Sequence, residues 1–467
     1  MTRAAMSALD QLYSAAPLLL QEVATTWYGW RVYRRRYKGI FAEEARRVRE
    51  RESWSTEQFI AYQIQQLRQI GEVARHSPFY RERFQLAGFD PAALEKPADL
   101  SVLPLLSRDQ LRLHGQDMLT ARPEHDVTTY KSSGTSGTPR NIYRSRRMDQ
   151  MIWAYWDARC WNWFGASHRS RKAVFGVRKV HPVRRMDPPF WRHDWLTGIC
   201  YFSIYHLRRE NLAHYCRELQ RFAPELMLAY PSAIYPVARF ALDEGVSLPR
   251  PRGIVTTSET LSAEQRRTIE QAFGCRIYDQ YGAAEACVFG ATCEQGHLHV
   301  SPDFGYLEVL KADGKPAEPG EMGEVVCTGF LNELQPLIRY QLGDVVRLSR
   351  LSHCACGRNM PIIEEICGRV EDMLHTVRGD PVIRFGPAFK GVHGIREGQV
   401  VQRAKDLFIV RIVPDPGFSA DEEATLIRNM ELHLGPGHVI RVEKVAQIPR
   451  TASGKFRAVV NEMASSA

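Results

Sequence analysis

Long apolar stretches are missing from this sequence of 467 residues. No run approaches the roughly 20 apolar residues that a membrane-spanning helix requires, so we expect no transmembrane segment. Internal repeats and low-complexity tracts are also absent. The apolar segment 15–20 is too short for the core of a signal peptide and precedes Gln21 and Glu22, which favours a cytoplasmic location.

Acidic residues are fewer than basic ones: 53 Asp and Glu stand against 62 Lys and Arg, which gives a net charge of +9. The excess is concentrated in segments 31–38 and 169–185. Such clusters can bind nucleic acid or an anionic membrane, but no nucleic-acid motif accompanies them. We therefore expect no nucleic-acid partner. For the aromatic and basic segment 18–41 two interpretations stay open: peripheral membrane contact as an amphipathic helix, or packing of its aromatics onto the main domain, which we favour.

Ten cysteines are too few for a disulfide framework in a chain of this length, which favours reduced thiols, some of them metal ligands. Cys293 and His299 flank a short turn, and Cys354 and Cys356 begin 55 residues after His299. Three thiolates and one imidazole at two turns suit a tetrahedral, structural Zn²⁺ with no open position for water. Three other residues are rival ligands: His297, His353 and Cys287.

The length predicts more than one hydrophobic core, and the 44% hydrophobic and 25% charged content is typical of globular proteins. Apolar residues at spacings of three and four predict a helical region over 55–122. Further on, expected strands alternate with expected helices, which indicates βαβ units and parallel sheets. The expected strands are 173–177, 226–230, 253–257 and 276–281, and the helices are 209–222 and 262–273.

Segments 305–310 and 323–328 have no helix between them and predict an antiparallel, barrel-like portion. Beyond 370, expected strands at 407–413 and 439–442 flank a helix at 420–434. We therefore expect an α/β fold: a large N-terminal domain with mixed and parallel sheets and a barrel-like portion, plus a small mobile α+β C-terminal domain. The expected divisions are an N-terminal helical extension at 1–54, the large domain at 55–370 and the small domain at 371–467.

The segment from Lys131 to Arg140 places five hydroxyl-bearing residues around two glycines. Glycines let backbone N–H groups approach an anion closely, and Ser132, Ser133, Thr135, Ser136 and Thr138 add hydroxyl donors. This composition is typical of a phosphate-binding loop, although the Walker pattern is absent. A flexible linker is the alternative interpretation.

Further motifs follow the loop in a fixed order: Tyr281–Glu285, Pro336–Asp344, Cys354–Arg358, Gly368–Met373 and Pro449–Lys455. Together with the loop, this set resembles the adenylate-forming superfamily of acyl-CoA synthetases, luciferases and adenylation domains. Within that superfamily it is similar to the phenylacetate-CoA ligase branch, including its relatives in capsule clusters. The resemblance extends from about Ser55 to Lys455.

The resemblance implies roles for single residues. Lys455 would bridge the substrate carboxylate and the α-phosphate of ATP, Glu285 would bind Mg²⁺, and Asp344 would bind the ribose. Arg369 would contact the sugar and phosphate, and Tyr281 would stack near adenine. The complete nucleotide set is Ser132, Ser133, Gly134, Thr135, Ser136, Gly137, Thr138, Glu259, Tyr281, Gly282, Asp344 and Arg369.

The acyl pocket is expected between the loop and Glu285, and its candidates are Tyr155, Trp156, Tyr230, Ser232 and Ala283. Aromatic residues among them favour an aromatic acid. The implied activity is formation of an acyl-adenylate and transfer to a thiol, with CoA as first choice and a carrier protein or an amine as alternatives. The implied cofactors are ATP, Mg²⁺, structural Zn²⁺ and CoA.

Two other functions stay open: an amide- or ester-forming ligase in polysaccharide or secondary-metabolite assembly, and a zinc-stabilised scaffold without turnover. A homodimer is compatible with the sequence. The resemblance also implies a hinge at Glu371 and Asp372. The segment 378–385 departs from the family pattern beyond this hinge, which bears on contacts with the acceptor.

Overall fold

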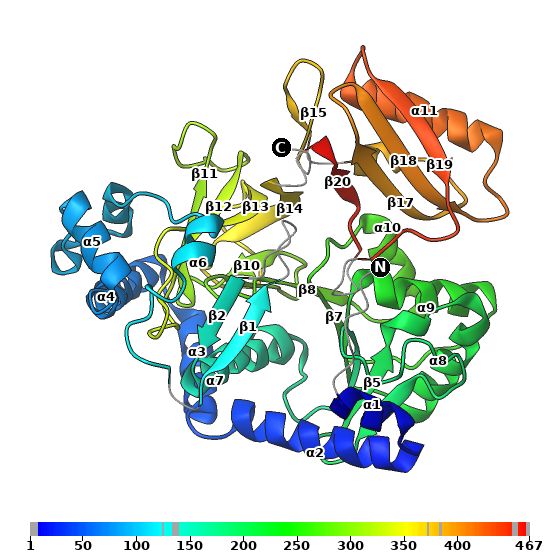
Figure 1. The fold of residues 1–467 in the computed structure, drawn as a ribbon, viewed down its shortest axis with the longest axis horizontal. Coiled ribbons are helices and arrows are strands. Elements are labelled where there is room, and N and C mark those ends of the chain that lie inside the picture. Colours follow the sequence, from blue (N-terminus) through cyan, green and yellow to red (C-terminus); the bar gives the residue numbers. More distant parts are fainter. Residues whose placement is uncertain are drawn as a thin grey trace.

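A mixed sheet of twelve strands forms the centre of the computed structural model, which describes residues 8–123, 126–132, 140–370, 373–382, 385–450 and 456–463 (Figure 1). The strand order is β11-β12-β13-β14-β10-β9-β8-β7-β6-β3-β5-β4. The strand bounds are β3 Lys172–Gly176, β4 Trp191–Asp194, β5 Ile199–Ser203, β6 Leu226–Ala229, β7 Gly253–Thr257, β8 Ile277–Gly282, β9 Phe289–Thr292, β10 Leu298–Val300, β11 Gly305–Leu310, β12 Met322–Gly329, β13 Tyr340–Leu348 and β14 Ile362–Arg369.

Strands β5, β3, β6, β7 and β8 run parallel, as the alternation of strands and helices predicted. Their connections include three helices: α8 Arg209–Phe222, α9 Pro231–Asp243 and α10 Ala263–Phe273. The start of α10 is fixed by a capping box, because Ser262 and Gln265 bind each other's backbone N–H groups. A buried apolar cluster lies between these strands and helices.

From β8 to β11 every strand pairing is antiparallel, which confirms the antiparallel expectation for 305–310 and 323–328. The barrel-like arrangement expected there differs from what is found. Because β10 pairs with both β9 and β14, the antiparallel strands continue the large sheet, and β11 lies at its edge.

Helices predicted over 55–122 are confirmed as α4 Thr56–Ala74, α5 Pro78–Ala87 and α6 Arg108–His114, which pack on the antiparallel half. Another apolar cluster joins α3 Phe41–Glu50 and α7 Arg146–Tyr155 to the sheet. A separate hairpin consists of β1 Thr128–Ser132 and β2 Arg140–Arg144.

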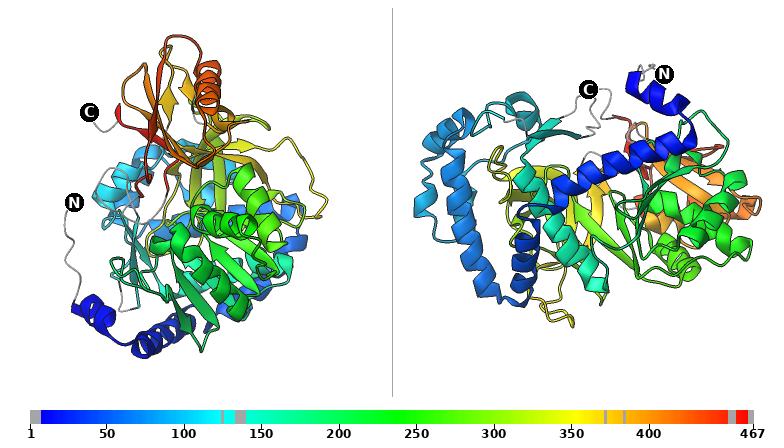
Figure 2. Two further views of the ribbon diagram at one scale, coloured as in Figure 1. Left: turned by 90° about the vertical axis from the view of Figure 1, so that its right-hand side faces the viewer. Right: turned by 90° about the horizontal axis from the view of Figure 1, so that it is seen from below.

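The chain begins with α1 Ala8–Ala15 and α2 Leu18–Tyr37, and α2 crosses the outside of the molecule when seen from below (Figure 2). Its buried residues are Gln21, Thr25 and Gly29. A Cβ at Gly29 would lie 1.7 Å from a carboxylate oxygen of Asp194, so glycine permits this close approach. The expectation that the aromatics of this segment pack onto the main domain is wrong for Trp27 and Trp30, which are exposed, whereas the ring of Tyr28 lies 4.9 Å from the Arg178 guanidinium.

The small C-terminal domain has its own sheet, in the order β19-β18-β17-β20, and its own apolar core. Its elements are β15 Leu374–His375, β16 Pro381–Val382, β17 Ile395–Gln402, β18 Leu407–Pro414, α11 Ala420–Leu434, β19 Val439–Lys444 and β20 Val459–Asn461. This α+β composition is the one expected from the sequence. Within the described ranges, none of the helices combines the length and apolarity needed to span a bilayer.

Candidate active site

Three strands bring Tyr281, Asp344 and Arg369 together. Asp344 on β13 lies directly opposite Arg369 on β14, and their side chains form an ion pair of 3.0 Å between Nε and Oδ1. The hydroxyl of Tyr281, on β8, donates to Oδ2 of Asp344 at 3.0 Å. Burial raises the pKa of Asp344, and the charge of Arg369 opposes this shift. Both carboxylate oxygens are therefore held in fixed directions, as the binding of a vicinal diol would require.

Glu285 lies in the turn between β8 and β9 and is buried. Its Oε1 accepts a hydrogen bond of 3.1 Å from the Tyr340 hydroxyl and lies 3.4 Å from a guanidinium nitrogen of Arg140. Neither partner was among the predicted site residues. Arg140 comes at the end of the glycine-rich loop, and Tyr340 lies within the motif 336–344. These positions in predicted motifs could have identified both residues.

The hairpin of β1 and β2 fixes both ends of the predicted phosphate loop, because Ser132 and Arg140 are opposite each other in its register. Ser133, Gly134, Thr135, Ser136, Gly137 and Thr138 lie outside the described residues, as does Lys455. The contact between Arg140 and Glu285 places the C-terminal end of this loop beside the candidate metal-binding carboxylate.

Glu259 connects two parts of the chain that are far apart in sequence. Its carboxylate accepts hydrogen bonds from the backbone N–H and hydroxyl of Ser232, at 3.0 and 2.9 Å, in the first turn of α9. It also accepts a hydrogen bond of 2.9 Å from the backbone N–H of Phe456. Glu259 therefore satisfies a free donor at the start of α9 and holds the residue that directly follows Lys455.

Several residues next to the candidate site have strained backbone conformations. Among the described residues, four non-glycine residues have positive φ, and three of them are Ser258 (70°), Ala286 (51°) and Arg339 (52°). These three precede or follow Glu259, Glu285 and Tyr340 directly. Strained conformations of this kind cluster at functional sites, because the surrounding structure must compensate their cost of about 1–3 kcal/mol each.

The five candidates for the acyl pocket fall into two groups. Tyr230 and Ser232 lie at the start of α9 and Ala283 lies in the turn of Glu285. Tyr155 is instead a core residue: its hydroxyl donates to the backbone oxygen of Asp303 at 2.9 Å, and its ring centroid is 4.9 Å from that of Phe304. Trp156 packs edge-on against Phe289, with ring centroids 5.9 Å apart.

The four predicted zinc ligands converge. One ligand atom from each of Cys293, His299, Cys354 and Cys356 lies within 4.8 Å of all the others. The sulfurs of Cys293 and Cys354 are 3.8 Å apart, and Cys356 Sγ is 3.4 Å from His299 Nε2. A disulfide needs about 2.05 Å. Tetrahedral Zn–S bonds of about 2.3 Å separate two sulfurs by about 3.8 Å, so the donor set fits zinc.

Nδ1 of His299 is 3.1 Å from the backbone oxygen of Met360, a contact that directs Nε2 towards the thiols. Burial lowers the pKa of His299, which favours the neutral imidazole that a metal binds. The three rival ligands are not members of this group of four. His297 contacts Cys354 Sγ at 3.1 Å, His353 is exposed, and Cys287 is part of the core of the antiparallel half.

Comparisons with known proteins find relatives along the whole chain. The family model described as "CapK C-terminal domain" matches residues 375–462. Protein CapK of Staphylococcus aureus is 26% identical over 97% of this chain and 100% of its own length. Phenylacetate-coenzyme A ligase of Thermus thermophilus is 27% identical over 71% of this chain and 74% of its own.

A solved structure with the same fold is that of 2-hydroxyisobutyryl-CoA ligase in the postadenylation state, in complex with R3-HIB-AMP. It aligns with a TM-score of 0.69 and 22% identity, over 89% of this chain and 92% of that one.

Proposed function

Since the chain belongs to the adenylate-forming superfamily, in the branch of CapK and the phenylacetate-CoA ligases, we propose that it activates a carboxylic acid with ATP and transfers the acyl group to CoA. In the first step a carboxylate oxygen attacks the α-phosphorus, and pyrophosphate leaves. In the second step the thiol attacks the acyl carbonyl, and AMP leaves.

The observation that carries this proposal is the arrangement of Asp344, held by Tyr281 and Arg369, beside the buried Glu285. Asp344 would accept hydrogen bonds from both ribose hydroxyls, since an ionised carboxylate has two acceptor oxygens. Arg369 would donate to the sugar and the phosphate. Tyr281 would act through its hydroxyl on Asp344 as well as through its predicted position near adenine.

Glu285 would hold Mg²⁺, whose charge would neutralise the phosphates as pyrophosphate leaves. The segment 132–138 would bind the β- and γ-phosphates. Arg140 directly follows this segment and contacts Glu285, which supports a position of the loop close to the metal. Lys455 would stabilise the charge that develops between the carboxylate and the α-phosphate.

The acid would bind near Tyr230 and Ala283, on the side of the site where Glu259 holds the start of α9. Tyr155 and Trp156 would support this wall from the core. An aromatic acid is our first choice because the ring of Tyr230, at the start of α9, lies in this region.

The acceptor has an alternative. The match to the phenylacetate-CoA ligase covers 71% of the chain, whereas the match to CapK covers 97%, and the model for residues 375–462 is that of CapK. The C-terminal domain is the part that would meet the acceptor. An amine or hydroxyl acceptor, giving an amide or ester, is our alternative to CoA.

The four-residue cluster of Cys293, His299, Cys354 and Cys356 would hold a structural Zn²⁺. Its four protein donors complete a tetrahedron, so the metal would stabilise the fold and take no part in the reaction.

We further propose that residues 371–467 form a mobile lid on the domain at 55–370, with its hinge at 371–372. The hydrogen bond from Phe456 to Glu259 supports a closed arrangement in which the Lys455 segment faces the site. The lid would reorient before acyl transfer, because the nucleophile must enter where Lys455 had been.

The direct test is acid-dependent exchange of pyrophosphate into ATP, measured with aryl and aliphatic acids, followed by AMP release with and without CoA or an amine. Exchange with at least one acid supports activation, and the acceptor that raises AMP release identifies the second step. Tight ATP binding without exchange for any acid would favour the scaffold alternative.

Replacing Tyr281 with phenylalanine is expected to raise the KM for ATP about 3- to 10-fold, because one hydrogen bond that orients Asp344 is lost. Asp344→Ala should raise it further, since both ribose acceptors disappear. The matched control is Tyr278→Phe on the same strand β8. Equal KM values for the Tyr281 and Tyr278 variants would contradict the role given to this hydroxyl.

Removing the Glu259 carboxylate with Glu259→Ala is expected to slow adenylation about 10-fold, because the charged acceptor for Phe456 is lost. Ser232→Ala is the control, since it removes one hydrogen bond at α9 and leaves the contact with Phe456. If both variants lose activity equally, Glu259 acts only on α9.

A further inference from the structure

Between Leu18 and Trp30, helix α2 presents polar and small residues to the protein and apolar residues to solvent. The buried positions Gln21, Thr25 and Gly29 are spaced by four and form one stripe. Arg192 Nε donates to Oε1 of Gln21 at 2.7 Å, and this polar contact fastens the helix to β4. An ordinary surface helix has the opposite arrangement.

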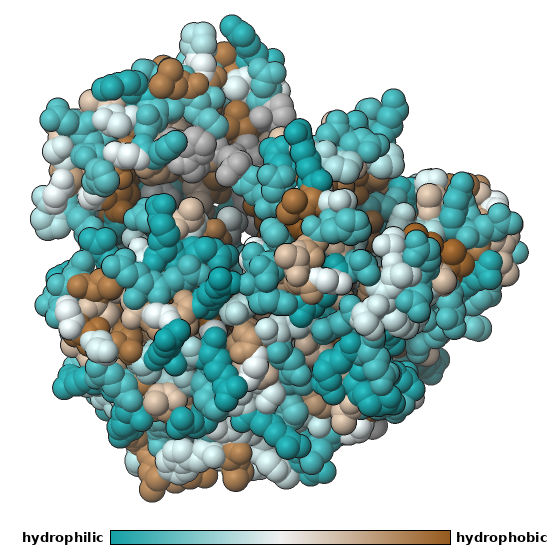
Figure 3. Space-filling view, turned by 180° about the vertical axis from the view of Figure 1, so that it is seen from behind, coloured by the Kyte–Doolittle hydropathy of each residue, from teal (hydrophilic) through white to brown (hydrophobic). Residues whose placement is uncertain are grey.

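Leu20, Val23, Trp27 and Trp30 follow one another at spacings of three and four, so they lie along one stripe on the outer side of α2. All four are exposed, Trp27 at 58% and Trp30 at 41%. The turn between β4 and β5 adds the exposed Trp195 and Leu196. Figure 3 shows hydrophobic side chains at the lower edge of the molecule, where α1 and α2 run in Figure 1.

The C-terminal half of the same stripe is basic. It carries Arg31, Arg34 and Lys38, and among the described residues none of these three forms an ion pair with a carboxylate. The Arg34 guanidinium lies 4.9 Å from the centre of the Trp30 ring. The single acidic residue of α2, Glu22, is turned towards the backbone N–H of His193. The exposed face of α2 is therefore apolar and cationic.

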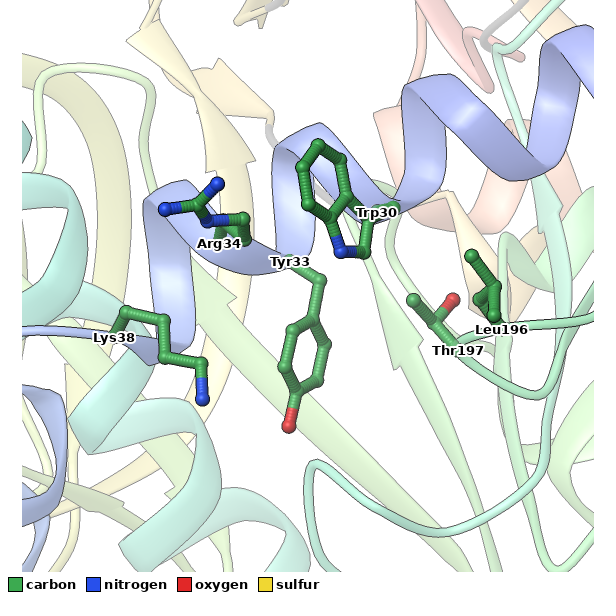
Figure 4. A pocket seen from close by; sticks show the side chains of 6 residues that line it. All are labelled: Trp30, Tyr33, Arg34, Lys38, Leu196 and Thr197. Carbon is green, nitrogen blue, oxygen red and sulfur yellow. The ribbon is translucent and has the colours of Figure 1, made fainter.

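A pocket of about 410 Å³ opens beside this face. It is lined by Trp30, Tyr33 and Arg34 of α2, by Lys38 just beyond the helix, and by Leu196 and Thr197 of the turn between β4 and β5 (Figure 4). Two cations and a tyrosine hydroxyl surround a partly apolar space, and this chemistry suits a phosphate that is attached to a lipid.

We propose that α2 and the turn between β4 and β5 lie on the surface of a bilayer that contains anionic lipids. Trp27 and Trp30 sit at the level of the headgroups, where indole rings are favoured, and Arg31, Arg34 and Lys38 meet lipid phosphates. The pocket beside Arg34 and Lys38 receives one headgroup phosphate. This association is independent of the reaction proposed above.

A second copy of the chain fits this face less well. Two copies joined by a two-fold axis along α2 would bring the cations of one helix towards those of the other, with no acidic residue on the face to pair with them. An anionic surface satisfies the apolar stripe and the cations together.

The experiment is cosedimentation of the full-length protein with vesicles of phosphatidylcholine, alone or mixed with phosphatidylglycerol. Wild type is expected to bind the anionic vesicles and to release as salt is added. Trp27→Ser with Trp30→Ser should weaken binding at least 10-fold. Arg34→Gln with Lys38→Gln should weaken it by roughly fivefold per charge and reduce the salt dependence.

Leu86→Ser and Leu432→Ser are matched controls, because these side chains are 81% and 78% exposed on α5 and α11. They should bind as wild type does. All variants should keep the wild-type melting temperature and pyrophosphate exchange in solution. Equal binding by wild type and the tryptophan variant, or equal binding to neutral and anionic vesicles, overturns the proposal. So does self-association that the tryptophan variant abolishes without any vesicle binding.

Discussion

Acid-dependent pyrophosphate exchange should fall about 10²-fold or more when Lys455 is replaced by alanine. The ammonium group is proposed to act only as the carboxylate approaches the α-phosphate, and removal of one donor that stabilises a transition state has an effect of this size. ATP binding should remain within a few-fold of wild type, because Asp344, Tyr281 and Arg369 are intact.

The control for this experiment is Lys444→Ala, which removes an ammonium group from β19 of the same domain. A synthetic acyl-adenylate separates the two steps: Lys455→Ala should still transfer its acyl group to the acceptor. Exchange at the wild-type rate, or equal loss of both steps, would refute the assignment of Lys455 to adenylation.

Loss of the proposed zinc site should damage folding before it damages the reaction. We expect Cys354→Ser or Cys356→Ser to lose the metal and to lower the melting temperature by roughly 5 °C or more, because a closed site of four ligands contributes its binding energy to the folded state. Metal analysis of wild type should give about one zinc per chain, as one site of this kind would.

Cys275→Ser is the matched control, since Cys275 is a free thiol that belongs to neither the site nor its neighbours. It should keep the metal and the melting temperature. Wild-type protein that is free of metal and equally stable would contradict the zinc proposal.

Most of the secondary structure could be predicted from local sequence. The helix 209–222 and the strands 253–257 and 305–310 have the expected bounds, because their apolar periodicity agrees with the packing that they find. The continuation of the antiparallel strands into the large sheet, in place of the expected barrel-like portion, could not be foreseen. These strands join the sheet through β10, a strand of three residues whose pairing with the distant β14 leaves no periodic signal.

The candidate site shows the same limit. Asp344 and Arg369 were selected as motif members, but their direct pairing depends on the register of β13 and β14. Arg140 and Tyr340 were missed because their common partner, Glu285, is distant in sequence from both. Helix α2 departs from the expected packing for a physical reason: apolar side chains ordinarily face the core, whereas here polar contacts of Gln21 fasten the helix and its tryptophans face outwards.

The cysteine cluster lies around the short strand β10 and therefore also bears on how the large sheet is held together. This strand connects β9 to β14 within the antiparallel part of the sheet, with three paired positions towards β9 and two towards β14, and so forms a bridge between them. His299 belongs to this bridge, Cys293 follows β9, and Cys354 and Cys356 precede β14. Tyr281, on β8, lies to one side of this bridge, and its hydrogen-bond partner Asp344, on β13, lies to the other. If the proposed metal binds there, it ties the turn after β9 to the segment before β14, and loss of the thiolates would loosen the stretch of sheet that separates Tyr281 from Asp344.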